Sequence, residues 1–492
     1  MLPARTVPLL LAHPLLSGGR PQQHKLRNTY YDTPNLALYR ARIALRIRQI
    51  DATKLQTVKS AGTVSGGLAH RNEWERPHVG SHFDFSEVDQ PDIRKILDRH
   101  QSQLKTIFTT HFCRTSWLLT LESGARIEIA LDRGHIESSG RHRLIRELEL
   151  ELKAGEPAAL FDLARELQQT LPLHPVVISK AEQGYALMRN KTSPAVRAKA
   201  SRLSPAMSPT DAYRHIASNC LEQLQRNETG LITGADDPEY LHQTRIALRR
   251  LQSVLHLFDT ALPAGYAEHW ELAWRDLAHQ TGNARNQDVL TLQTLPRIAA
   301  DLQHDDELSS IIRISERARA TLHQQIRRTL RSPEYSRLLI DFSRSLHTLP
   351  DLVTAGRRTA DKHNDELDRL MRHQLSRLAH RANDQASQFH QLDTKGHHRM
   401  RIACKALRYA LESFAPLLPE KKTTRYLKQL DALQDVLGQL NDLAVARTII
   451  SGLRGVRPNG SIMAWLDRQV DTTKQGLIHQ LRRFDGLDPP WK

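Results

Sequence analysis

In the first half of the chain, the residues that could do chemistry are charged residues that alternate with apolar ones along short segments. An extended backbone would place Arg46 and Arg48 on one face, with apolar residues on the other. Segment 147–153 (ELELELK) would set three glutamates and a lysine on one face and three leucines on the other. The same alternation of charged and apolar residues returns at 73–75 and at 126–129.

The segregation of these charges is more informative than their number. A sheet with one solvated face is the ordinary origin of any single alternating strand. Like charges on one face repel, however, so a solvated face more naturally mixes signs. Arginines on one strand and acids on others favour a closed barrel with opposing groups inside. Its arginines would bind phosphate oxygens, its carboxylates would hold a divalent metal, and water would attack a phosphorus neutralised on both sides.

A row of basic side chains is predicted on a helix in the second half of the chain. His242, Arg245 and Arg249 are spaced i, i+3 and i+7, which places them on one helical face. Segments 242–258 and 398–414 are identical at seven of seventeen positions. A solvated face explains one such helix, but the duplicated offset favours binding of a long polyanion between facing helices. The candidate residues are His242, Arg245, Arg249, Arg250, His398, Arg401, Lys405 and Arg408.

The elements that must position these residues change character near position 190. Before it the pattern predicts mainly strands; after Ser208, an N-cap candidate with Asp211 in the first turn, it predicts only helices. Segments 282–289 and 438–445 match in the same order as the first repeat, which indicates an internal duplication. The expected strands are 43–50, 55–60, 114–121, 126–132 and 144–153, and the expected early helices are 91–100 and 156–171.

These patterns predict an α+β protein with an N-terminal β-barrel and an all-α helical bundle that contains a duplication. A chain of 492 residues is long enough for two or three domains. The expected boundaries are a first domain at 1–189, a linker at 190–207 rich in Lys, Ser, Ala and Pro, and a helical domain at 208–486.

Composition narrows the class of partner. A net charge of +16 favours polyanions. The sequence has neither aromatic residues interleaved with the basic ones nor a known DNA-binding motif, so nucleic acid is not favoured as the partner. Three cysteines without a CxxC pair favour neither a disulfide framework nor a structural zinc site, and predict a reducing cytoplasm. We expect no targeting signal in residues 1–19 and no membrane span.

Five motifs resemble the CYTH, or triphosphate tunnel metalloenzyme, family. They are 30–34 (YYDTP), 44–48 (ALRIR), 55–59 (LQTVK), 147–153 (ELELELK) and 179–185 (SKAEQGY). The resemblance covers about residues 25–188. It implies an eight-stranded antiparallel tunnel that hydrolyses inorganic triphosphate or a related compound with Mg²⁺ or Mn²⁺.

The resemblance also implies roles for individual residues. Phosphate contacts are implied for Arg46, Arg48, Lys59, Arg114 and Lys180. Metal-binding or water-orienting roles are implied for Asp132, Glu147 and Glu149, with Glu128 and Glu73 or Glu75 as further tunnel acids. Glu73 and Glu75 share a face, so alternation does not separate them.

The family's ExExK first strand has no counterpart in this sequence, whose first glutamate is Glu73. Residues 13–16 (HPLL) resemble the segment that comes after that strand in relatives. The expectation is therefore either a start upstream of Met1 or a metal site without part of its ligands. The second case predicts a severe loss of catalysis, because such a site supplies the largest electrostatic contribution.

Residues 209–484 resemble the CHAD family, whose helical domains often follow CYTH domains and bind inorganic polyphosphate. Two hypotheses follow for the whole chain. It is either a metal-dependent triphosphatase with a polyphosphate-binding helical domain, or a non-catalytic polyphosphate-binding or targeting protein with a degenerate tunnel.

Overall fold

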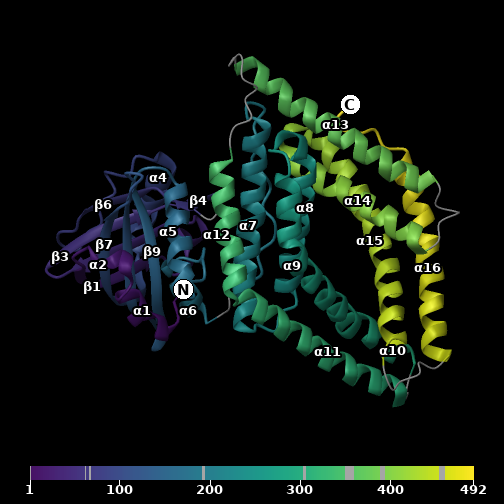
Figure 1. Cartoon of the computed structure of the whole chain (residues 1–492), viewed down its shortest axis with the longest axis horizontal. Helices are drawn as coiled ribbons and strands as arrows, with labels where there is room; N and C mark the ends of the chain where they lie inside the picture. Colours follow the sequence, from purple (N-terminus) through teal and green to yellow (C-terminus); the bar gives the residue numbers. More distant parts are fainter. Residues whose placement is uncertain are drawn as a thin grey trace. The chain divides into compact units, whose positions relative to one another are not determined.

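Antiparallel strands form the framework of the first of two units. The computed structural model describes residues 2–60, 62–65, 68–190, 194–302, 306–349, 360–387, 394–453 and 460–492. One unit comprises Met1–Pro194 with Arg331–Thr348, and the other comprises Ala195–Leu330 with Leu349–Lys492 (Figure 1).

The main sheet of the described residues has seven strands in the order β6-β3-β2-β1-β7-β8-β9. All neighbouring strands pair antiparallel, which confirms the predicted antiparallel sheet. The strands are β1 (Gln22–Asp32), β2 (Ala44–Ile50), β3 (Thr53–Lys59), β6 (Glu73–Pro77), β7 (Lys105–Thr120), β8 (Arg126–Ser138) and β9 (Arg141–Ala154), with a separate pair β4 (Thr63–Ser65) and β5 (Leu68–His70).

Strand β1 and the first part of β7 were not predicted as strands, although β1 lies centrally between β2 and β7. Its inward positions include Asn28 and Asp32, both fully buried. Polar residues at buried positions hide the apolar alternation that identifies a strand. Asn28 is satisfied by a hydrogen bond that its Nδ2 donates to Thr110 Oγ1 on β7, at 2.9 Å.

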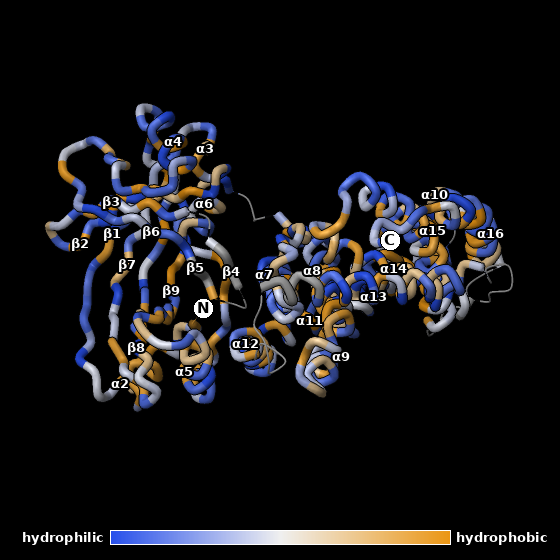
Figure 2. The backbone as a smooth tube through the Cα atoms, turned by 90° about the horizontal axis from the view of Figure 1, so that it is seen from above, coloured by the Kyte–Doolittle hydropathy of each residue, from blue (hydrophilic) through white to orange (hydrophobic). Residues whose placement is uncertain are grey.

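Helices cover the outer faces of this sheet. The apolar face of β8 packs under α5, with Ile127, Ile129 and Leu131 against Leu160 and other leucines (Figure 2). Each buried aliphatic side chain stabilises such a core by about 1.5–3 kcal/mol. The helices of this unit are α1 (Val7–Leu11), α2 (Pro14–Ser17), α3 (Ala37–Arg40), α4 (Pro91–His100), α5 (Ala158–Thr170), α6 (Lys180–Arg189) and α12 (Pro333–Thr348).

Two motifs far apart in the sequence meet at Asp32. This buried carboxylate accepts hydrogen bonds from the backbone N–H groups of Leu38 and Tyr39, each at 2.9 Å, and so caps α3. It also accepts one from the Tyr185 hydroxyl on α6, at 2.9 Å. The YYDTP motif therefore supports the fold, because it anchors α6 against the sheet.

Helix α12 belongs to the first unit, although it lies far along the chain within residues that the sequence assigned to the helical domain. It packs on α5: the His347 ring stacks on Phe161 with centroids 5.2 Å apart. The Arg344 Nε donates to Asp162 Oδ1 at 2.5 Å. Periodicity does not predict this placement, because it indicates that a helix is amphipathic but not which surface covers the apolar face.

The second unit is helical in its described residues, and none of the described helices combines the length and apolar run that a membrane crossing requires. Ser208 caps its first helix by accepting from Asp211 N, as the sequence predicts. Its helices are α7 (Pro209–Thr233), α8 (Glu239–Phe258), α9 (Tyr266–Val289), α10 (Leu295–Asp301), α11 (Asp306–Leu330), α13 (Ala360–Ser387), α14 (Thr394–Phe414), α15 (Glu420–Ser451) and α16 (Gly460–Asp485).

Residues 191–193 of the expected linker lie outside the described residues. The following segment belongs to the second unit, where Val196 exchanges hydrogen bonds with the Asn227 side chain of α7.

The duplicated segments contact their own counterparts. Helix α8 packs on α14, α7 on α13, and α9 on α15. The aligned residues Phe258 and Phe414 meet with ring centroids 5.6 Å apart. This pairing of like with like is the arrangement of a two-fold interface, here within one chain.

Candidate functional site

Three neighbouring strands hold a cluster of acids and cations on the inner face of the sheet. Register places Arg114 of β7 opposite Asp132 of β8, and Asp132 opposite Glu147 of β9. Arg114 donates to both oxygens of Asp132, each at 2.7 Å, and to Glu149 Oε2 at 2.5 Å. This bidentate geometry holds the guanidinium with one edge toward the interior.

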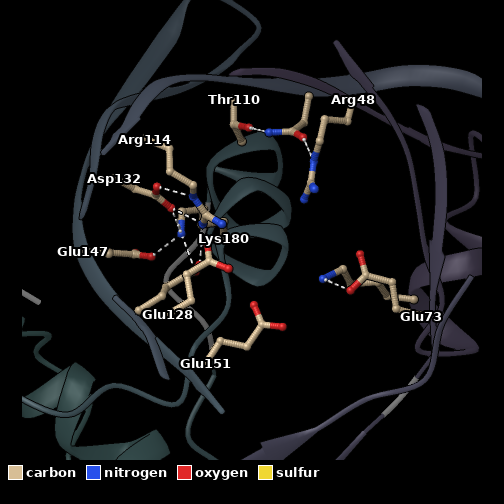
Figure 3. Close-up of polar contacts among 12 residues, drawn as sticks. Arg48, Glu73, Thr110, Arg114, Glu128, Asp132, Glu147, Glu151 and Lys180 are labelled. Carbon is tan, nitrogen blue, oxygen red and sulfur yellow. Dashed lines mark hydrogen bonds and ion pairs between the residues drawn. The ribbon is translucent and has the colours of Figure 1, made fainter. Parts of the chain in front are cut away.

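Lys180 completes this cluster from α6. Its Nζ lies 2.8 Å from Asp132 Oδ2, 2.9 Å from Glu147 Oε2 and 2.6 Å from Glu149 Oε1 (Figure 3). A capping box fixes the start of α6, because Ser179 and Glu182 satisfy each other's backbone N–H groups. Lys180 is the first residue of that helix, so the cap determines where its ammonium lies.

The opposite wall of the interior is built by β2, β3 and β6. Arg46 Nη2 lies 3.3 Å from Glu73 Oε1, and Lys59 Nζ lies 2.8 Å from Glu73 Oε2. Arg48 Nη1 lies 3.6 Å from Glu75 Oε2. Figure 3 shows Arg48 and Glu73 pointing toward Arg114, Asp132 and Lys180 across the interior of the curved sheet.

Ion pairs within each wall keep its acidic and basic side chains charged. In the acid cluster, burial disfavours the Glu149 carboxylate, but Lys180 and Arg114 outweigh it and lower its pKa to about 2. The pKa of Lys180 is raised, because the three carboxylates outweigh its burial. On the facing wall, burial of Arg46 is outweighed by Tyr30 and Glu73, which raise its pKa. All these groups therefore keep their charges at neutral pH.

Two further side chains contact the acids of this wall and were not predicted as site residues. Lys153 Nζ bridges Glu128 Oε2 at 3.0 Å and Glu151 Oε1 at 2.7 Å. Gln183 of α6 donates to Glu147 Oε1 at 2.7 Å. Alternation had already placed Lys153 on the glutamate face of the ELELELK segment, but it was not among the candidate site residues. No local pattern marks Gln183, because it reaches the site only through tertiary contact.

The donor set of the acid wall fits a divalent metal. Asp132, Glu147 and Glu149 offer carboxylate oxygens from two adjacent strands, which is the ligand type that Mg²⁺ and Mn²⁺ take. All six of these oxygens already accept from Arg114, Lys180 or Gln183. A metal would therefore share the carboxylates with these donors.

A second group of cations converges in the helical unit. Arg249 of α8 lies close enough to Arg245 on the same helix, and to Arg401 and Lys405 of α14, to lower the pKa of all three. Burial, then Arg401, Arg249 and Arg245, lowers the pKa of Lys405 to about 6. Burial and the neighbouring Arg249 and Arg401 lower the pKa of Arg245 to about 9. Such mutual repulsion is what a polyanion would relieve.

The remaining predicted polyanion ligands divide between this cluster and other contacts. His242 faces it, since burial and then Arg285 lower its pKa. Arg250 is buried and donates to Gln223 Oε1 on α7 at 3.3 Å. Arg408 is paired with Glu412 and Asp431, and His398 contacts Asn441 at 3.3 Å.

Arg285 also lies at this cluster, although it was not predicted as a polyanion ligand. It lies within the repeated 282–289 segment, so the duplication offered a signal for it.

The curved sheet with acidic and basic walls, joined to a duplicated helical unit, defines a two-module class of protein. Residues 8–185 match the CYTH domain model, and residues 215–451 match the CHAD domain model. The chain therefore carries a CYTH domain followed by a CHAD domain.

Relatives were found for each part. An inorganic triphosphatase of Haemophilus influenzae is 36% identical over 165 residues, which span 33% of this chain and 46% of that protein. A solved CHAD domain from Ricinus communis is 29% identical, covers 61% of this chain and 99% of its own, and has a TM-score of 0.49. A putative adenylyl cyclase from Hippeastrum, described as having dominant triphosphatase activity, is 20% identical over 39% of this chain and 94% of its own, with a TM-score of 0.29.

Proposed function

We propose that the CYTH domain hydrolyses inorganic triphosphate, or a related triphosphate, within its curved sheet. The observation that carries this proposal is the pair of facing walls, one led by Arg46, Arg48 and Lys59 and the other by Asp132 and its acidic neighbours. The match to the CYTH domain and the name of the Haemophilus relative support the same chemistry.

Different residues would bind the substrate, hold the acid wall and orient the attacking water. Arg46, Arg48 and Lys59 bind the phosphate oxygens, which releases Glu73 and Glu75 from their present ion pairs. Arg114 and Lys180 hold the acid wall in place and contact the oxygens at the other end of the substrate. Water attacks the terminal phosphorus, the P–O bond to the bridging oxygen breaks, and a carboxylate of the acid wall orients the water.

A divalent ion on Asp132, Glu147 and Glu149 would neutralise the charge that develops on the phosphate oxygens. We propose Mg²⁺ or Mn²⁺ for this role, because the donors are all carboxylate oxygens.

The test is phosphate release from triphosphate with Mg²⁺ or Mn²⁺. Arg46→Ala removes a buried cation aimed at the substrate, and we expect a loss of about 100-fold in kcat/KM. Arg133→Ala is the matched control, because Arg133 is an exposed residue on the outer face of β8. Equal rates for the wild type and Arg46→Ala would contradict the assignment of the basic wall.

A second candidate function is non-catalytic polyphosphate binding. It is favoured by the engagement of all six oxygens of Asp132, Glu147 and Glu149 by cations and an amide of the chain itself. No phosphate release by the wild type with either metal, together with retained binding of triphosphate, would establish this candidate over the first.

For the CHAD domain we propose binding of inorganic polyphosphate. The supporting observation is the convergence of cations from α8 and α14 with depressed pKa values, which marks a surplus of positive charge. A chain of phosphates offers the repeated charges that such a row requires. The residues proposed are six of the eight predicted from the sequence, with Arg285 added. Arg250 is left out because it is buried against α7, and Arg408 because it is paired with Glu412 and Asp431.

Charge reversal tests this second proposal. The double variant Arg245→Glu, Arg401→Glu replaces two central cations, and we expect polyphosphate affinity to fall at least about 100-fold. Arg425→Glu is the control, since Arg425 is exposed on α15. Unchanged affinity in the double variant, with its helical circular dichroism intact, would contradict the assignment.

A further inference from the structure

A group of histidines lies on the outer face of the sheet, on the side opposite the acid wall. Asp132 points inward from β8, so His135 and Glu137 point outward by strand alternation. Register places His142 of β9 directly opposite Glu137, and His111 of β7 directly opposite His135. Three adjacent strands thus bring three imidazoles and one carboxylate to one patch.

The geometry of this patch suits a single ion. The potential ligand atoms of His135, Glu137 and His142 all lie within 4.8 Å of one another. The His135 and His142 rings meet edge to face with centroids 5.4 Å apart. His111 stacks on His135 at 5.3 Å, and its Nε2 lies 4.0 Å from Glu137 Oε2.

Ordinary surface pairing does not account for the group. Within the described part of the chain, neither His135 nor His142 has a hydrogen bond or ion pair to its ring nitrogens. The ring nitrogens of both histidines are therefore available as ligand atoms beside the Glu137 carboxylate. The paired strands fix the backbone on both sides, so only side-chain rotations separate this arrangement from a coordination shell.

We infer that His135, Glu137 and His142 form a binding site for a transition-metal dication such as Zn²⁺. Two imidazoles and one carboxylate are a common zinc ligand set, and water or His111 can take the fourth position. Mixed nitrogen and oxygen donors distinguish this site from the all-carboxylate wall, which suits harder ions.

Binding there would connect β8 and β9 at the end of their hairpin. The inner faces of the same two strands carry Asp132 and Glu147. An ion that binds only the folded chain stabilises it in proportion to the logarithm of its concentration. The site is therefore expected to stabilise the strands that hold the acid wall, without contributing a group to it.

Calorimetric titration of the full chain with Zn²⁺, in excess Mg²⁺ to occupy the carboxylate wall, tests the inference. We expect one Zn²⁺ per chain at this site, and loss of that equivalent or at least about tenfold weaker binding in His142→Ala and in Glu137→Gln. His82→Ala is the control, because His82 is exposed in a loop of the same unit.

A second measurement, the melting temperature, distinguishes loss of the metal site from misfolding of the variant. Zn²⁺ should raise the melting temperature of the wild type and of His82→Ala, and should leave that of His142→Ala unchanged. The melting temperatures of all three in chelator should agree. Zn²⁺ binding of equal stoichiometry and affinity in wild type and His142→Ala, or no Zn²⁺ bound by wild type, would overturn the inference.

Discussion

Cations occupy two opposite electrostatic environments in this chain. Lys180 is surrounded by Asp132, Glu147 and Glu149, and its charge is stabilised by all three. Lys405 is surrounded by Arg401, Arg249 and Arg245, and its charge is destabilised. The first arrangement supports a fold and holds a site in shape. The second stores repulsion that Asp442 offsets only in part, and that a bound anion or the loss of a proton would relieve.

Lys405 gives a pH dependence with a definite sign. Its pKa is about 6 in the free protein, so it is mostly neutral at pH 7. A bound polyphosphate would raise that pKa, so binding takes up a proton. We expect the affinity contribution of Lys405 to rise as pH falls from about 8 to 6, by at most about tenfold per unit. Calorimetry in buffers of different ionisation enthalpy would measure the proton uptake.

The variant Lys405→Met should remove this proton uptake and flatten the profile. Between about pH 6 and 10, Lys405 is protonated in the unfolded chain but neutral in the folded chain, so the proton it binds favours unfolding. Lys405→Met removes this effect and should therefore also raise the melting temperature without ligand. Lys428→Met on the exposed face of α15 is the control. Proton uptake that persists in Lys405→Met would assign it to another group.

At the scale of elements, the position of α6 determines whether Lys180 reaches the acid wall. Three contacts fix the helix: the capping box at Ser179, the Tyr185 hydroxyl on Asp32, and the close approach of Gly184 to Phe108. A Cβ at Gly184 would lie 2.2–2.5 Å from atoms of the Phe108 ring, well inside contact distance. The backbone of α6 can therefore reach the sheet only with glycine at this position.

We expect Gly184→Ala to displace α6 and destabilise the protein by about 1–3 kcal/mol. Because Lys180 is on the same helix, phosphate release should fall with it. Gly476→Ala is the matched control: Gly476 is also within a helix, nothing lies within 4 Å of its added Cβ, and a gain of about 0.5–1 kcal/mol is expected. Denaturant titration measures both, and equal effects would contradict the packing argument.

At the scale of the whole molecule, the chain does not follow its domains in order. It leaves the second unit after Leu330, contributes α12 to the first, and returns at Leu349. Helix α12 covers α5 through the Phe161–His347 stack and the Arg344–Asp162 ion pair. The first unit is therefore incomplete when defined by residues 1–194 alone.

A fragment of residues 1–194 should accordingly bind a synthetic peptide of residues 331–348. We expect the peptide to raise the melting temperature of the fragment, since it binds the folded form. A peptide of the same composition in scrambled order should not. Equal melting temperatures with the two peptides would show that α12 contributes nothing to the first unit.

Local patterns identified much of this protein. Alternation identified Arg46, Arg48 and the glutamates of 147–153 as residues of one face, and helical spacing with duplication identified the rows at 242–249 and 398–405. These features depend on residues close in sequence, whose relative positions follow from strand and helix geometry.

Long-range contacts decided the rest. The pairing of Lys180 with three acids joins segments more than 30 residues apart, and no periodicity encodes it. The central place of β1 depends on buried polar residues that satisfy each other only after the strands have paired. The burial of α12 on α5 and the meeting of His111, His135 and His142 likewise depend on strand order and packing. The physical reason is that a sequence pattern specifies the face a residue occupies, whereas tertiary structure determines what that face meets.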